Sequence, residues 1–231
     1  MVAELQQVVK IYETPGSEIQ AKVLDGISLT IHQGETLAIT GPSGSGKSTL
    51  LNILGTFDKP TSGQVLLDGS PVLLTNERLV SELRNRYLGF VFQLHHLLPQ
   101  LSLLENVLLP LLPNKDKSQH KAATESALHL LEKVGLKDHL HNKPSQLSVG
   151  ECQRAAVVRA LINHPRLLLA DEPTGSLDAD NAALLIQLLL ELKQELEFSM
   201  VIVTHSSVLA KNMDTVYHLA GSKLTKLQLT T

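Results

Sequence analysis

Four short runs of hydrophobic residues lie along the chain without the alternation expected of a half-exposed strand. They are "TLAIT" (36–40), "LGFVF" (88–92), "LLLA" (167–170) and "MVIVT" (200–204). Continuous apolar runs of this length are typical of strands buried on both faces, as in a parallel sheet covered by helices. The pattern therefore predicts an α/β fold with a mainly parallel central sheet.

A residue suited to chemistry follows each run. Gly41 opens a glycine-rich turn, and the other runs lead to Gln93, to Asp171 with Glu172, and to His205. Ligands of open α/β sheets gather outside the carboxyl ends of the strands. We therefore expect these residues to converge on one edge of the sheet and to form a site there.

Two further patterns flank these runs. Residues 5–33 and 63–74 contain short strand-like stretches with the turn sequences "HQGE" and "LDGS", which predict an antiparallel side sheet. From "HHLLPQLSLLENVLLPLL" onward the pattern becomes helical. We interpret residues 94–160 as a helical subdomain that is inserted into a catalytic core made of residues 1–93 and 161–231. The whole chain, 1–231, is then a single domain.

Composition narrows the class of protein. The chain has 231 residues, 43% of them hydrophobic, and a net charge of −3, so a broad basic surface for nucleic acid is not expected. A single cysteine, Cys152, excludes an internal disulfide and suggests a reducing compartment. The N-terminus lacks the pattern of a signal peptide, and prolines interrupt "VLLPLLP", so we expect no membrane span.

The segment "GPSGSGKST" (41–49) fits the P-loop pattern G-x-x-x-x-G-K-[ST] between a predicted strand and a predicted helix. Such a loop cradles phosphates with backbone N–H groups at a helix N-terminus. Lys47 is expected to neutralise phosphate oxygens, and Ser48 to ligate Mg²⁺. The alternative is an ordinary glycine-rich turn. The predicted phosphate-binding residues are Gly41, Pro42, Ser43, Gly44, Ser45, Gly46, Lys47, Ser48 and Thr49.

The residues that follow the other runs complete the expected chemistry. Asp171 is expected to hold the hydration shell of Mg²⁺, and Glu172 to polarise the attacking water. We expect Gln93 to contact both the metal and the water, and His205 to hydrogen-bond the γ-phosphate or orient the water. The alternatives are a solvated turn for the two carboxylates and ordinary hydrogen-bonded polar residues for Gln93 and His205.

The segment "LSVGE" (147–151) carries Ser148 and Glu151 in the S-x-x-E spacing of a capping box, which predicts a helix start. Gly150 leaves backbone N–H groups bare at this helix start, where an anion can bind. The alternative is a simple N-cap with no ligand.

Together these motifs resemble the nucleotide-binding subunit of ABC transporters, because "LSVGE" lies between Gln93 and Asp171 and is followed by "SLD" (176–178) and His205. The resemblance covers nearly the whole chain. It implies a RecA-like P-loop NTPase core with an antiparallel side sheet and an inserted helical subdomain. It also implies that the chain is an ATPase with ATP and Mg²⁺ as its ligands.

The resemblance further implies a head-to-tail pair of subunits that encloses two ATP molecules. Each nucleotide then lies between the P-loop of one subunit and "LSVGE" of the other, which gives Ser148, Gly150 and Glu151 a role in binding the partner's ATP. Asp178 is expected at the dimer interface. Tyr12 matches the aromatic position that stacks on adenine, with an edge-strand tyrosine as the alternative.

Within this family the chain resembles the group that includes LolD, MacB and FtsE, and "HHLLP" after Gln93 resembles LolD members, which extract lipoproteins from the bacterial inner membrane. The implied partners are a second copy and integral membrane subunits that dock near residues 93–106; a plain buried segment is the alternative for that stretch. The chain would then be peripheral, on the cytoplasmic side of the inner membrane. The alternatives are MacB-like efflux, FtsE-like signalling or a weakly hydrolysing regulatory module.

Three positions depart from the family pattern. Val149 replaces a glycine of the usual signature, Cys152 stands where Arg or Gln is common, and Ser206 stands where Asp is usual. These changes bear on the rate of hydrolysis more than on the binding of ATP.

Overall fold

A computed structural model describes residues 1–13, 20–73, 76–113 and 117–228, with the side chains of 117–120 left aside. Its centre is a six-stranded sheet in the order β10-β9-β3-β8-β7-β6. The four predicted runs are four neighbouring, parallel strands of this sheet, as predicted. The strands are β3 (Thr36–Thr40), β6 (Leu88–Val91), β7 (Leu167–Asp171), β8 (Ser199–Val203), β9 (Thr215–Ala220) and the antiparallel edge strand β10 (Lys223–Leu227).

Both faces of the central strands are buried, which explains their uninterrupted apolar sequences. In β3, Leu37 and Ile39 join a core beneath the side sheet, whereas Ala38 joins a second core on the opposite face. In β7, Leu169 belongs to the core beneath the side sheet and Ala170 to the core on the opposite face. Because side chains alternate along a strand, a sheet buried on both sides needs an apolar residue at every position.

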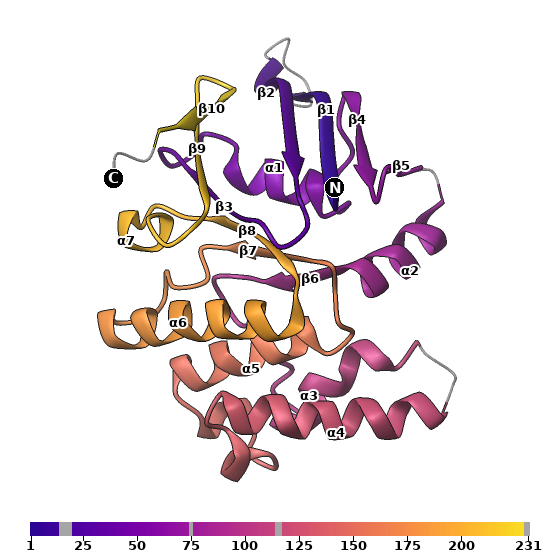
Figure 1. Ribbon diagram of the computed structural model, residues 1–231, viewed down its shortest axis with the longest axis vertical. Coiled ribbons are helices and arrows are strands. Elements are labelled where there is room, and N and C mark those ends of the chain that lie inside the picture. Colours follow the sequence, from indigo (N-terminus) through magenta and orange to yellow (C-terminus); the bar gives the residue numbers. More distant parts are fainter. Residues whose placement is uncertain (14–19, 74–75, 114–116, 229–231) are drawn as a thin grey trace.

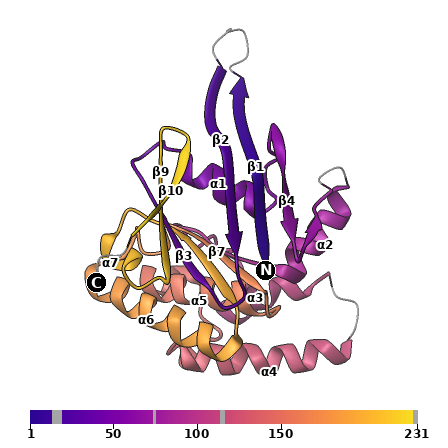
Figure 2. The same ribbon diagram turned by 45° about the horizontal axis from the view of Figure 1, so that its top comes forward.

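The predicted antiparallel side sheet is confirmed. Its order is β2-β1-β4-β5, formed by β1 (Ala3–Glu13), β2 (Gln20–Ile31), β4 (Ser62–Leu67) and β5 (Ser70–Pro71). Figure 1 shows helix α1 (Lys47–Leu54) between this sheet and the central sheet, and Figure 2 shows the long β1–β2 pair rising beside it. The buried face of α1 therefore helps to join the two sheets through one core.

Helices cover the other face of the central sheet in two layers (Figure 1). The inner layer is α5 (Val149–Leu161) and α6 (Ala179–Leu196), and the outer layer includes α3 (Leu103–Leu108) and α4 (Lys117–Lys133). The remaining helical elements are α2 (Glu77–Tyr87), α7 (Ser207–Ala210), η1 (Leu109–Leu111), η2 (Lys137–His139) and η3 (Pro144–Gln146). Within the described parts of the chain, no helix combines the length and hydrophobicity that a membrane span requires.

The predicted helical pattern begins too early. Residues 94–102 form no helix, and the first helix of this region, α3, begins at Leu103 after the N-cap Ser102. The fully buried side chain of Asn106 explains the difference, because its Nδ2 donates to the carbonyls of Leu98, Leu101 and Ser102. These bonds satisfy the loop backbone in place of helical ones.

The predicted division into a core and an inserted subdomain of residues 94–160 stays a prediction. Ala155, Ala156 and Val158 of α5 belong to the same buried cluster as Ala38 and Met200 of the central sheet. Helix α5 therefore packs directly against the strands on one side and against the outer helices on the other.

Candidate functional site

The P-loop wraps the N-terminus of α1 as an open cradle. Gly46, the N-cap, has a φ of 99°, and no side chain caps the helix there. Gly41 has a φ of 150°, and a Cβ at that position would lie 2.2 Å from the carbonyl oxygen of Leu219. The loop thus depends on glycine for both its conformation and its close packing. Uncapped N–H groups at a helix start form a ready site for a phosphate.

Two side chains of the P-loop suit an anionic ligand. Lys47 Nζ donates to the carbonyls of Gly41 and Pro42 at 2.9 Å each. Its positively charged ammonium group is therefore held against the start of the P-loop. The hydroxyl of Ser45 is buried and has no hydrogen-bond partner among the described residues. A buried hydroxyl is normally satisfied, so this one fits a phosphate oxygen.

Asp171 ends β7 beside the P-loop. Burial raises the pKa of its carboxyl, while a hydrogen bond with Ser48 and the charge of Lys47 act in the opposite direction. A carboxylate and a hydroxyl in contact are the hard oxygen donors that Mg²⁺ prefers. The residues present therefore fit this ion, and further ligands would come from the phosphates and water.

Glu172 and His205 form a direct pair. His205 Nδ1 lies 2.9 Å from Glu172 Oε1, and the backbone N–H of His205 donates to Oε2 at 3.3 Å. Glu172 adopts a positive φ of 47°, which is unusual for a residue with a side chain and is often found at functional sites. Its carboxylate is thus held in place at the edge of the sheet.

Gln93 lies exposed in the loop after β6 and meets the loop after β7. The Cβ position of Gly175 is 3.0 Å from Gln93 Nε2, and Ser176 Oγ donates to the carbonyl of Gln93 at 3.1 Å. The structure therefore brings Gln93 to the loop that begins at Glu172.

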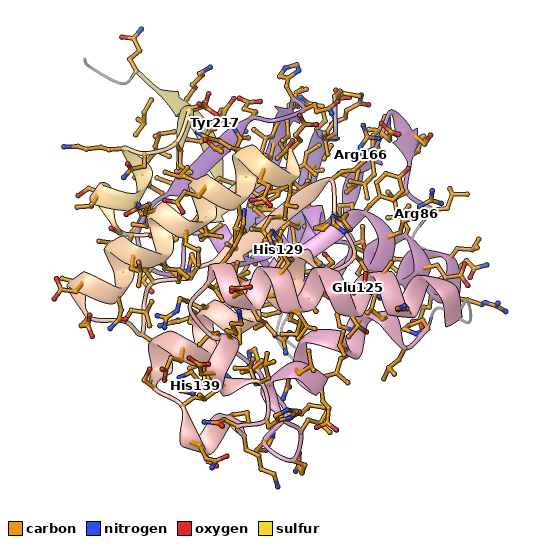
Figure 3. The ribbon with its side chains drawn as sticks, turned by 60° about the horizontal axis from the view of Figure 1, so that its bottom comes forward. Arg86, Glu125, His129, His139, Arg166 and Tyr217 are labelled. Atoms are coloured by element: carbon orange, nitrogen blue, oxygen red, sulfur yellow. The ribbon has the colours of Figure 1, made fainter. Side chains whose placement is uncertain are left out.

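The N-terminus of α5 has the predicted capping box. The hydroxyl and backbone N–H of Ser148 donate to Glu151 Oε2 at 2.8 and 2.7 Å, and the N–H of Glu151 donates back to Ser148 Oγ at 3.3 Å. These bonds from Ser148 lower the pKa of Glu151. His139, labelled in Figure 3, lies 3.7 Å from Glu151 Oε1. The capping box does not occupy the backbone N–H groups of Val149, which is exposed, and of Gly150, which is buried against Asn181.

Asp178 caps α6 next to this helix start. Its two carboxylate oxygens accept from the backbone N–H and the side-chain amide of Asn181, each at 2.8 Å. A Cβ on Gly150 would lie 2.8 Å from Asn181 Oδ1, so only glycine fits between α5 and α6 without displacing Asn181. The segments that contain Ser148 and Asp178 are therefore packed into one unit.

Tyr12 lies on β1 and is 43% exposed. Its hydroxyl donates to Asp58 Oδ2 at 2.7 Å, and Lys10 Nζ lies 4.7 Å from the centre of its ring. Lys10 also forms an ion pair with Asp58 at 2.6 Å. Burial and the bond to Asp58 raise the pKa of Tyr12, which also contacts Thr49 of the P-loop. The sequence analysis missed this anchoring, because Asp58, which bonds to both Tyr12 and Lys10, is 46 residues from Tyr12 along the chain.

The predicted site residues fall into two groups. The P-loop, Asp171, Glu172, His205, Gln93 and Tyr12 gather at the carboxyl edge of the sheet. Ser148, Gly150, Glu151 and Asp178 lie around the start of α5, and no hydrogen bond or ion pair among the described residues joins them to residues 41–49. The candidate residues of one chain therefore form two separate groups, which we call the two half-sites.

Comparison with known proteins shows which family the chain is similar to. The sequence model of the ABC transporter family matches residues 24–175. The chain is 48% identical to the lipoprotein-releasing system ATP-binding protein LolD of Shewanella frigidimarina, over 91% of this chain and 87% of that protein. It is 46% identical to LolD of Alcanivorax borkumensis, over 98% of this chain and 97% of that protein.

Solved structures show the same fold. A dimeric bacterial ABC transporter cassette, MJ0796, aligns with a TM-score of 0.86 at 36% identity, over 99% of this chain and all of that one. A dimer of the same cassette in a post-hydrolysis state, bound to ADP and phosphate, aligns with a TM-score of 0.85.

Proposed function

The chain belongs to the ABC transporter family as an ATP-binding, ATP-hydrolysing subunit, and from this premise we propose that it drives the release of lipoproteins from the bacterial inner membrane. The substrate class is proposed because lipoprotein release is named for relatives that are 46–48% identical over nearly their full length.

The separation of the two half-sites carries the proposed mechanism. The P-loop half binds one ATP, and the start of α5 in a second copy closes over its γ-phosphate. Free N–H groups at Val149 and Gly150, at the positive end of the helix dipole, support this role. A solved relative that is a dimer supports a pair of chains, which we propose to assemble head to tail on two ATP.

Hydrolysis requires a base beside the γ-phosphate. We assign this role to Glu172, whose carboxylate accepts a proton as the oxygen of water forms its bond to phosphorus and the bond to the leaving ADP breaks. His205 holds Glu172, and Gln93 approaches from the neighbouring loop. Mg²⁺, held by Ser48, Asp171 and Gln93, would neutralise charge on the phosphates.

Tyr12 is proposed to stack on adenine. Lys10 lies 4.7 Å from the ring centre, and Asp58 holds its hydroxyl. A ring fixed in this way offers a planar surface to a base at a small entropic cost.

We propose that membrane subunits dock beside residues 93–106. Leu94 and Leu98 are 64% and 46% exposed, whereas Leu97 and Leu103 are buried, so this segment presents leucines that the core does not use. An adjacent groove of about 350 Å³ is lined by residues that include Phe57, Arg84, Phe90 and Phe92. An apolar surface of this kind suits a helix of a membrane subunit. The chain would thereby be held at the cytoplasmic side of the inner membrane.

The decisive experiment uses the intact complex. The chain is purified from membranes together with its bound subunits, which are identified, and the complex is reconstituted into liposomes that hold a fluorescent protein with an N-terminal lipid anchor. We expect ATP to release this protein into solution with wild-type chain and not with Glu172→Gln. ATP hydrolysis without release would contradict the lipoprotein substrate and favour efflux or signalling.

A further inference from the structure

One buried side chain of α5 holds both loops of the proposed catalytic edge. Gln153 is fully buried, and its Nε2 donates to the carbonyl of Phe92 at 2.8 Å and to that of Pro173 at 3.0 Å. Phe92 immediately precedes Gln93, and Pro173 immediately follows Glu172. A single amide therefore fixes the backbone next to two proposed site residues.

The chemistry of Gln153 argues against a simple packing role. Both carbonyl groups only accept hydrogen bonds, so the NH₂ group must face them. Its Oε1 is buried with no partner among the described residues. An apolar side chain of similar length would avoid the cost of this unpaired oxygen, so the amide is explained by its two donated bonds.

Other contacts surround the same junction. The carbonyl of Phe92 is held by Gln153, and the carbonyl of Gln93 accepts from Ser176 Oγ, so both peptide groups that flank the Gln93 side chain are fixed. Further along this loop, the guanidinium of Arg159 on α5 donates to the carbonyls of His95 and His96. Helix α5 thus holds the loop at two places.

We propose that Gln153 is a positioning residue that couples α5 to Gln93 and Glu172. The start of α5 binds the γ-phosphate of the ATP held by the other subunit. Any shift of α5 that results is transmitted through the two hydrogen bonds of Gln153 to Gln93 and Glu172, which lie beside the attacking water. This inference rests on the proposed function and adds a physical link between the two half-sites of one chain.

The test is Gln153→Met, which keeps an unbranched side chain and removes both donated bonds. We expect kcat for ATP to fall about 10- to 100-fold, because small displacements of catalytic groups have effects of that size, while KM and the Kd for ATP stay within about twofold. The matched control is Arg154→Met, the next residue of α5, whose Nε donates to the carbonyl of Val134 outside these loops. The control should lose stability without losing kcat.

A double-mutant cycle separates positioning from a general loss of structure. If Gln153 acts partly through Gln93, Gln153→Met should lower kcat by a smaller factor in a Gln93→Ala background than in the wild-type background. The same factor in both backgrounds, or a wild-type kcat for Gln153→Met, overturns the proposal.

A second variant covers the case in which Gln153→Met does not fold. In Gln153→Glu, a carboxylate would repel the two carbonyls, whereas its protonated form donates one hydrogen bond. We expect the ratio of its kcat to the wild-type kcat to rise as the pH falls, and a constant ratio contradicts the inference. Wild-type chain that fails to hydrolyse ATP at all would instead contradict the catalytic roles proposed above.

Discussion

The helices α1 and α5 both offer their N-termini to phosphate in the proposed mechanism, but they are built differently. Helix α1 begins at a glycine in the left-handed region and has no side-chain cap. Helix α5 begins with Ser148 and Glu151, which close two of the N–H groups with the chain's own side chains. Lys47 adds a positive charge to the first helix start, whereas Glu151 adds a negative charge to the second.

This difference indicates that the two helix N-termini bind phosphate with different strengths. The α1 end is suited to bind a highly charged nucleotide by itself, because bare N–H groups and a cation act together. The α5 end, partly satisfied already, attracts phosphate more weakly and is suited to a contact that forms and breaks in each cycle. Four variants test this contrast, in order of decreasing effect.

The largest effect is expected at Glu172. In the proposed mechanism this residue acts when the N-terminus of α1 and the N-terminus of α5 from a second copy enclose one ATP. Glu172→Gln should lower kcat by about 10²- to 10⁴-fold, because the water loses its base, while ATP binding persists. Size-exclusion chromatography with light scattering should then detect a dimer that accumulates with ATP. Glu191→Gln, on the exposed part of α6, is the matched carboxylate control. Absence of an ATP-dependent dimer would contradict the role given to Glu172.

Lys47→Ala tests the N-terminus of α1, which is expected to bind phosphate more strongly. The loss of its charge-assisted bonds to phosphate should weaken ATP binding by about a hundredfold or more, as measured by calorimetry. Lys226→Ala removes a lysine from the edge strand β10 and should bind ATP like the wild type. Unchanged affinity in Lys47→Ala would show that α1 does not hold the nucleotide.

Gly150→Ala tests the N-terminus of α5, which is expected to bind phosphate more weakly. The added methyl would meet Asn181 Oδ1 and displace the partner of the Asp178 cap. We expect kcat to fall by roughly tenfold through poorer closure, since about 1.4 kcal/mol is enough for that change, and the affinity of the monomer for ATP to stay the same. A fall in monomer affinity equal to that of Lys47→Ala would remove the contrast between the two ends.

Ser148→Ala should have the smallest of the four effects. Loss of the cap should destabilise the protein by about 1 kcal/mol, which lowers the Tm by about 2–4 °C for a chain of this size. The pKa of Glu151 lies below its ordinary value of 4.5, so the capping box stabilises the fold above that pH and loses this contribution as the pH falls through the lowered pKa. The Tm difference between wild type and Ser148→Ala should therefore shrink in acid. A difference that is independent of pH would contradict this account.

Two departures from the family pattern now have structural explanations. Val149 is 53% exposed at the start of α5, so its side chain enters no core. Ser206 caps the short helix α7 by accepting from the N–H of Leu209 at 3.3 Å, and an aspartate could do the same. Cys152 is buried with its Sγ 3.6 Å from the carbonyl of Pro144. Among the described residues, no hydrogen bond joins the side chain of Val149, Cys152 or Ser206 to residues 41–49.

The sequence by itself determined the four central strands, the P-loop and the start of α5. These features depend on near neighbours: apolar runs record burial on both faces, and glycine spacing or the Ser148–Glu151 pair records local backbone geometry. The same local view missed the edge strands β9 and β10 and placed a helix at residues 94–102, where Asn106 holds a loop instead.

Only the tertiary structure decided which distant groups meet. Gln153 reaches a carbonyl 61 residues away, and Tyr12 is fixed by Asp58, 46 residues away. No periodicity predicts such bonds, because their free energy is gained only when separate elements pack and exclude water. The separation of the two half-sites is a result of the same packing, since it places the start of α5 away from the P-loop of its own chain.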